Sequence, residues 1–305
     1  MNISNALSTM LLPCPPGPPV YLKKRSIHDE LPDLQTNLDG VTFREASSIQ
    51  DYISCFSLLH DVYVEAGFIQ PSPIPLRIIP HHSDPEARVF MGCPIDTKAG
   101  NRPIYTVSLF PDNEQGLPMD IGFKREVDVL RNQGRRLAEV GCLASHPEFR
   151  KGDKKIPMLG NRMVVSYAIN TLHVDDLLIT VHPKYLKIYE DILLFEKIGQ
   201  ISSYSYVNDN PAVALRQNLK TWPQKLKEVY GKNPIEKNLY HFLFESEPTS
   251  TALKSVEENR ADNKNFVIKA INSELLTNLR QIAIPTHENI YNYFMSFREE
   301  LSAAG

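Results

Sequence analysis

The sequence predicts an α/β protein, because segments with strand periodicity alternate with segments of helical periodicity. Two observations lead to this prediction. Residues 177–181, LLITV, form a short continuous apolar run, which is typical of a strand covered on both faces. Residues 49–63 and 183–192 instead keep apolar side chains at helical spacing, as helices packed against a sheet do.

Composition limits the possible classes of protein. A chain of 305 residues with 42% hydrophobic content can bury one large core or two smaller ones. A formal charge of -3 gives no electrostatic footprint for nucleic acid as the main partner. The four cysteines lack a CxxC or zinc-ligand spacing, so neither a disulfide framework nor a metal site is expected. No apolar run approaches membrane-spanning length and no signal peptide is evident, so a cytoplasmic location is expected.

The first 110 residues are expected to contain a tail, a helix, a loop and several strands. Residues 1–38 include PCPPGPP, and their composition predicts a disordered tail. A strand is expected at 41–47 and a helix at 49–63. A proline-rich loop over 69–88 follows, and its adjacent histidines, His81 and His82, are expected to be exposed rather than metal-bound. Further strands are expected at 88–93 and 104–110.

A carboxylate stands among apolar residues in the next predicted strand, 137–144, which follows a helical segment at 120–134. Alternation places Glu139 on one side with Leu137, Gly141 and Leu143, and places Val140 and Cys142 on the other side. Burial disfavours the charged form of a carboxylate and raises its pKa. Glu139 is therefore paired, protonated or used in chemistry, and a salt bridge to Arg135, to Arg136 or to a partner elsewhere in the chain is the structural alternative.

A basic segment follows this strand. Arg150, Lys151, Lys154 and Lys155 surround Gly152 in a turn before a helix that begins near Pro157. A basic turn at a helix N-terminus suits a phosphate or pyrophosphate, and a solvated loop is the alternative.

The remaining chain yields one buried strand and several helices. After 177–181, His182 and Pro183 open a helix that carries Tyr185 and Tyr189, which are either core residues or proton donors. Residues 195–207 are expected to form strand, and NPAVALRQNL is expected to start a helix capped by Asn210. Residues 231–305 are expected to form a helical extension. Its apolar stripes lie at 266–279 and at Ile290, Tyr293, Phe294, Phe297 and Leu301.

Four segments taken together resemble the GNAT acyltransferase superfamily, and more narrowly its FeeM-type N-acyl amino acid synthase branch, which is related to LuxI-type autoinducer synthases. The resemblance covers about residues 41–220. The segments are VYVEAGF at 62–68, LAEVGCLASHPEFRKG at 137–152, VHPKYLKIYEDILLFEKIG at 181–199 and YVNDNPAVAL at 206–215.

The resemblance implies a mixed sheet that splays beside the strand carrying the acid, within an acyltransferase domain at 39–230. It implies an acyl-phosphopantetheine thioester as cosubstrate, on acyl carrier protein or coenzyme A, and no tightly bound cofactor. The acceptor would be the amine of an amino acid. Glu139 matches the family acid, and Tyr189 matches the tyrosine near the thiol. Leu143, Ala144, Arg150, Lys151 and Gly152 match the positions that hold the thioester arm.

Two departures keep other readings open. Gly141 and Cys142 stand where the family's acid strand usually has serine and arginine, so the cation of that motif is missing. Leu194 stands where the closing motif usually has glycine. An acyl-homoserine lactone synthase, a small-amine acetyltransferase and a non-catalytic acyl-binding module are therefore the alternatives.

Overall fold

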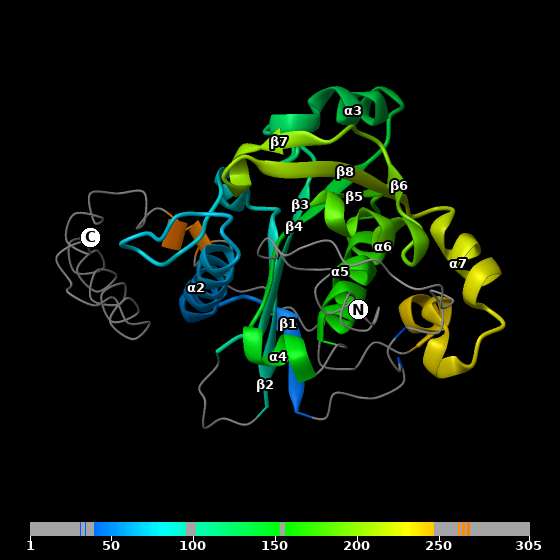
Figure 1. Ribbon diagram of the computed structural model, residues 1–305, viewed down its shortest axis with the longest axis horizontal. Coiled ribbons are helices and arrows are strands. Elements are labelled where there is room, and N and C mark those ends of the chain that lie inside the picture. Colours follow the sequence, from blue (N-terminus) through cyan, green and yellow to red (C-terminus); the bar gives the residue numbers. More distant parts are fainter. Residues whose placement is uncertain are drawn as a thin grey trace.

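A computed structural model describes residues 31, 34, 40–95, 102–152, 156–246, 262, 264, 265, 267 and 268, with residues 150–152 described by their backbone alone (Figure 1). The predicted α/β class is confirmed. One sheet has the strand order β1-β2-β3-β4-β5-β8-β6, and β7 also pairs with β8. The strands are β1 (Val41–Glu45), β2 (Arg88–Pro94), β3 (Tyr105–Pro111), β4 (Leu137–Ser145), β5 (Asp176–Val181), β6 (Glu196–Lys197), β7 (Ser202–Tyr204) and β8 (Asn210–Asn218).

Helices cover both faces of this sheet (Figure 1). Helix α2 buries its apolar side against β2 and β4 on one face, whereas α5 contributes to the larger core on the other face. A Cβ atom at Gly160 in α5 would collide with the ring of Tyr105, so this close approach to β3 requires glycine. The helices are α2 (Ile49–Glu65), α3 (Asp120–Asn132), α4 (Pro147–Gly152), α5 (Ile156–Asn170), α6 (Leu186–Asp191) and α7 (Trp222–Tyr230).

Short helical turns occupy several connections. The 3-10 turns are η2 (Pro80–Ser83), η4 (Pro183–Tyr185), η5 (Ser205–Val207) and η6 (Ile235–Lys237), and η7 (His241–Glu245) is a π-helical turn. None of the helices in the described residues combines the length and apolar composition that crossing a bilayer requires.

The sheet splays between β4 and β5. These strands pair in parallel from Leu137 opposite Asp176 to Val140 opposite Ile179, and the pairing then stops. Strand β4 continues to Ser145, where it still pairs with β3. The two strands therefore separate immediately beyond Glu139, as the family resemblance implied.

A β-bulge changes the side-chain pattern predicted for β4. The pairing with β3 shifts between Thr106 and Ser108, and Cys142 adopts a positive φ of 50°. Cys142 consequently packs in the cluster on the side of Leu137, while Leu143 contacts the core that also receives Val140. The predicted strict alternation was wrong beyond Gly141, because a bulge adds one residue to the strand.

The predicted helix at 210–219 was also wrong, because these residues form β8. Asn210 and Pro211 imitate a helix start, but such a cap is worth only about 1 kcal/mol. Strand β8 pairs with β5 along most of its length and buries four consecutive apolar residues, Ala212 to Leu215, on both faces. Pairing and burial on this scale outweigh a local propensity.

Two smaller expectations also need correction. The segment predicted as a basic turn begins as the short helix α4, since Pro147 is compatible with a first helical turn. His82, expected to be exposed, is fully buried and bonds Ser108 Oγ through Nε2 at 3.0 Å. Burial lowers the pKa of His82 to about 3, so its ring is neutral.

The core includes residues from outside 39–230. Leu31 and Leu34 are buried, and the Leu34 amide donates to the Glu236 carbonyl at 2.8 Å. Lys264 donates to the carbonyls of Asp84 and Ala87, and Val267 is buried against α2. The stripe at residues 290–301 lies outside the described residues, and the division into tail, domain and extension stays a prediction.

Candidate active site

A cavity of about 190 Å³ opens where β4 and β5 separate. One part of its wall is apolar and aromatic, from α5, β5, α6 and α7. Residues of that part include Met158, Val164, Val165, Leu177, Ile179, Tyr185, Leu193, Phe195 and Trp222. Polar side chains line another part, and they include Tyr63, Arg77, Glu139, Thr180, Tyr204 and Tyr206. The cavity can therefore hold an apolar chain beside a reactive polar group.

Glu139 is 2% exposed, and from the described residues it receives only neutral hydrogen bonds. The Met119 amide donates to Oε2 at 2.7 Å, and Thr180 Oγ1 donates to Oε1 at 3.3 Å. Among the described residues Glu139 forms no ion pair, so the predicted alternative of a salt bridge to Arg135 or Arg136 is wrong. Arg135 pairs with Asp176 instead, and Arg136 is exposed.

Burial is the main reason why the pKa of Glu139 rises to about 8. The hydrogen bonds from Met119 and Thr180 lower this pKa, and the nearby charge of Asp120 raises it. A carboxylate with a pKa near 8 can accept a proton at neutral or mildly basic pH.

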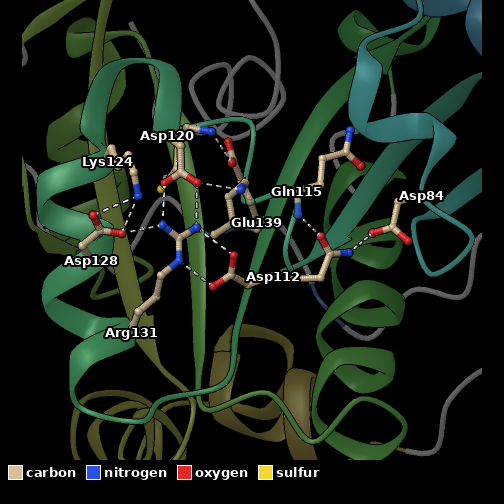
Figure 2. Close-up of polar contacts among 11 residues, drawn as sticks. Asp84, Asp112, Gln115, Asp120, Lys124, Asp128, Arg131 and Glu139 are labelled. Atoms are coloured by element: carbon tan, nitrogen blue, oxygen red, sulfur yellow. Dashed lines mark hydrogen bonds and ion pairs between the residues drawn. The ribbon is translucent and has the colours of Figure 1, made fainter.

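An arginine fixes the turn that presents the Met119 amide to Glu139 (Figure 2). Arg131 binds Asp112 through two hydrogen bonds of 2.7 and 2.8 Å, and it binds Asp120 through two of 2.7 and 3.0 Å. Asp120 Oδ2 also accepts from the Leu117 amide at 2.9 Å. The turn is therefore held at both ends by charge-assisted bonds, which orient the donor toward the carboxylate.

Tyr189, the tyrosine predicted on the helix after β5, lines the same cavity as Glu139. Its ring meets Phe195 edge-on at 5.6 Å, and burial raises the pKa of its phenol. A buried phenol stays protonated at neutral pH, so it can donate a proton but does not supply a charge.

The other predicted site residues lie in different places. Leu143 lines the cavity, whereas Ala144 is buried against α2. Arg150, Lys151 and Gly152 lie at the end of α4, where only the backbone is described, and Lys154 and Lys155 lie outside the described residues. The described residues contain no group of three His, Cys, Asp or Glu side chains that could hold a metal ion.

Sequence reasoning missed the other polar residues of the cavity. Arg77 sits in the segment LRIIP, which has no clear periodicity, and Tyr204 and Tyr206 sit in a predicted strand where nothing marked them as residues of a site. A lone arginine between apolar residues in a proline-rich loop was the only available signal for Arg77.

Leu194 has a φ of 57°, which explains why glycine is usual at this position of the motif. The carbonyls of Leu193 and Leu194 accept from Gln217 Nε2 at 2.8 and 3.0 Å. These bonds hold a conformation that costs a non-glycine residue roughly 1 kcal/mol.

A mixed sheet that opens beside a buried carboxylate, together with an apolar cavity, defines an acyltransferase of the GNAT-like class. A model of the family described as N-acyl amino acid synthase FeeM matches residues 54–218, which is more than half of the chain. The chain belongs to the FeeM family of N-acyl amino acid synthases.

One solved structure supports the fold. The structure of FeeM, an N-acyl amino acid synthase from uncultured soil microbes, is 24% identical, covers 60% of this chain and 93% of its own, and has a TM-score of 0.51. A spermidine N-acetyltransferase SpeG mutant from Vibrio cholerae is 13% identical, covers 60% of this chain and 96% of its own, and has a TM-score of 0.40. A search of curated protein sequences finds no match.

Proposed function

We propose that this chain transfers a long-chain acyl group from an acyl-phosphopantetheine thioester to the amine of an amino acid, giving an N-acyl amino acid. The observation that carries the proposal is the buried Glu139, which has no counter-charge among the described residues and faces an apolar cavity where the sheet opens. Family membership supports the same chemistry.

Glu139 acts as the general base in the proposed reaction. Its carboxylate removes a proton from the acceptor ammonium, and the freed nitrogen lone pair attacks the thioester carbonyl carbon. A carbon–nitrogen bond forms, and the carbon–sulfur bond then breaks. The departing thiolate takes a proton from the Tyr189 phenol, which burial keeps protonated, and the phenol regains a proton from the attacking nitrogen, which must lose its second proton to become an amide. The products are an amide and a free thiol.

The apolar wall suits the acyl chain, because removing apolar surface from water favours binding by about 25 cal/mol per Å². We infer that the thioester arm passes along the edge of β4 near Leu143 and Ala144, beyond the last pair with β5. Acyl carrier protein is the proposed donor, which places the reaction in the cytoplasm. Arg150, Lys151 and Gly152 would meet the phosphate of its arm.

The test is acyl transfer by the purified full-length chain. Acyl carrier proteins and coenzyme A carrying chains of several lengths are offered with a panel of amino acids and amines, and products are identified by mass spectrometry. Long-chain N-acyl amino acids support the proposal. Acyl-homoserine lactone or acetylated amine as the sole product would favour one of the alternative enzymes.

Charge reversal at Arg150, Lys151, Lys154 and Lys155 tests the donor. Acyl carrier proteins are acidic, so affinity should fall, and the loss should shrink as salt rises. Unchanged affinity at low salt would indicate a solvated basic segment with no role in docking.

A further inference from the structure

Arg77 brings a positive charge to the polar part of the cavity wall. Its backbone amide donates to the Phe56 carbonyl of α2 at 3.0 Å. Its Nη2 donates to the Tyr206 carbonyl at 2.7 Å. Arg77 therefore connects α2, through its backbone amide, to the turn η5, through its guanidinium, and the residue is held in place before any ligand arrives.

Within the described part of the chain, the guanidinium of Arg77 lacks the carboxylate partner that several other arginines have. Arg44 pairs with Asp51, and Arg131 pairs with several aspartates, including Asp112. Among the described residues Arg77 forms no ion pair, and its buried Nε has no hydrogen-bond partner. A buried donor without a partner is costly, so an anionic ligand at this position would be stabilised.

Arg77 and the carboxylate of Glu139 give the wall of the cavity groups of opposite charge. Burial raises the pKa of the Cys142 thiol to about 12, while the nearby Arg77 lowers it and the nearby Glu139 raises it. Cys142 therefore lies within the field of both groups. An α-amino acid likewise carries an ammonium and a carboxylate, both attached to one carbon.

We propose that Arg77 binds the carboxylate of the acceptor and so selects amines that carry a carboxylate. A guanidinium suits this task because its planar donors match the two oxygens of a carboxylate. With the carboxylate held at Arg77, the amine is directed toward Glu139. This assignment rests on the proposed function and adds a specificity-determining residue to it.

The experiment compares acceptors that differ only in the carboxylate. L-leucine is paired with 3-methylbutylamine, and L-phenylalanine is paired with 2-phenylethylamine, using a thioester donor that the wild-type chain accepts. The measured quantity is the ratio of kcat/KM for the amino acid to kcat/KM for its amine. Arg77→Gln should lower this ratio at least about tenfold, mainly through the KM of the amino acid.

Two further variants control the result. Arg77→Lys keeps a positive charge but loses the planar pair of donors that matches a carboxylate. Its ratio should therefore lie between those of wild type and Arg77→Gln. Arg125→Gln removes an exposed arginine of α3 and should leave the ratio unchanged. Circular dichroism checks that each variant is folded. If Arg77→Gln does not fold, the ratio measured for Arg77→Lys serves as the test.

The assignment is overturned if Arg77→Gln leaves the ratio unchanged, or if it slows both acceptors equally, which would indicate a role toward the donor or in folding. A wild-type chain that acylates no amine would refute the proposed function instead. In that case calorimetry with L-leucine and L-phenylalanine decides. Binding that Arg77→Gln abolishes supports the site, and a wild-type chain that binds neither amino acid overturns it.

Discussion

Glu139 and Asp176 are two buried carboxylates on neighbouring strands, and their surroundings differ. Asp176 is 0% exposed and lies between Arg135 and Arg216, whose Nε donates at 2.8 Å. Glu139 is 2% exposed, and in the described part of the chain it accepts hydrogen bonds only from a backbone amide and a hydroxyl. The charge of Asp176 is thus compensated by the fold, whereas the charge of Glu139 is not.

This difference separates a structural carboxylate, Asp176, from the proposed catalytic one, Glu139. Ion pairing fixes the ionised form of a buried acid, which suits a group that joins β4, β5 and β8 but never exchanges a proton. Leaving a buried acid without a counter-charge raises its pKa toward the working pH, which suits a proton acceptor. Burial therefore leaves a carboxylate ionised where cations lie beside it, as at Asp176, and raises its pKa where no described residue supplies one, as at Glu139.

The largest expected effect comes from breaking the compensated site. Asp176→Asn should lower the free energy of unfolding by about 3 kcal/mol, because two largely buried arginines lose their partner. Urea denaturation measures the change. Asp128→Asn, which removes an exposed member of an ion-pair network on α3, is the control and should change stability little.

Removing the uncompensated carboxylate should instead affect the rate. Glu139→Gln should lower kcat/KM about 100-fold, equivalent to about 2.7 kcal/mol of barrier, since the general base is lost. The variant should remain folded, because no counter-ion among the described residues is left unpaired. Product formation and melting temperature are measured together, and wild-type turnover would remove Glu139 from the mechanism.

Stability should depend on pH through Glu139. Its pKa is about 8 in the folded chain against an ordinary 4.5, so the folded state retains a proton that the unfolded state has lost between these values. Stability contributed by this group therefore falls as pH rises from about 4.5 to 8, by at most about 1.4 kcal/mol per pH unit. Subtracting the pH profile of Glu139→Gln from that of wild type isolates the effect, and identical profiles would contradict the raised pKa.

The smallest effect is expected at the weaker hydrogen bond to Glu139. Thr180→Val removes the 3.3 Å bond to Oε1 and leaves the 2.7 Å bond from Met119. The pKa of Glu139 should rise further, which moves the acidic limb of the pH–rate profile upward by roughly half a unit. Thr180→Ser keeps a hydroxyl and should restore the wild-type profile, so a shift in both variants would exclude this hydrogen bond as the cause.

Sequence patterns predicted β5 and α2 well, because each has a strong apolar periodicity of its own. They failed at β8, whose start imitates a helix cap and whose pairing partners are distant in sequence. They also failed at Cys142, where a bulge changed the side that the residue faces. Strand pairing and bulges are set by tertiary contacts, which a single sequence does not contain.

The sequence likewise pointed to some residues of the candidate site and not to others. Glu139 could be recognised because a carboxylate inside an apolar strand is conspicuous. Its donor at Met119 could not be recognised, because a backbone amide leaves no trace in the choice of side chain. Arg77 is brought to the cavity by a proline-rich loop that has no periodicity to interpret.

The Met119 donor has a consequence for how this protein can change during evolution. Every substitution at position 119 except proline retains the N–H group, so side-chain replacement there leaves this hydrogen bond to Glu139 available. What can shift the donor is the shape of the turn, which Arg131 maintains, from more than ten residues along the chain, by its ion pairs with Asp112 and Asp120. The pKa of the proposed base, Glu139, therefore depends on the ion pairs of Arg131 on α3. Substitutions in those ion pairs would change this pKa without altering any residue that lines the cavity.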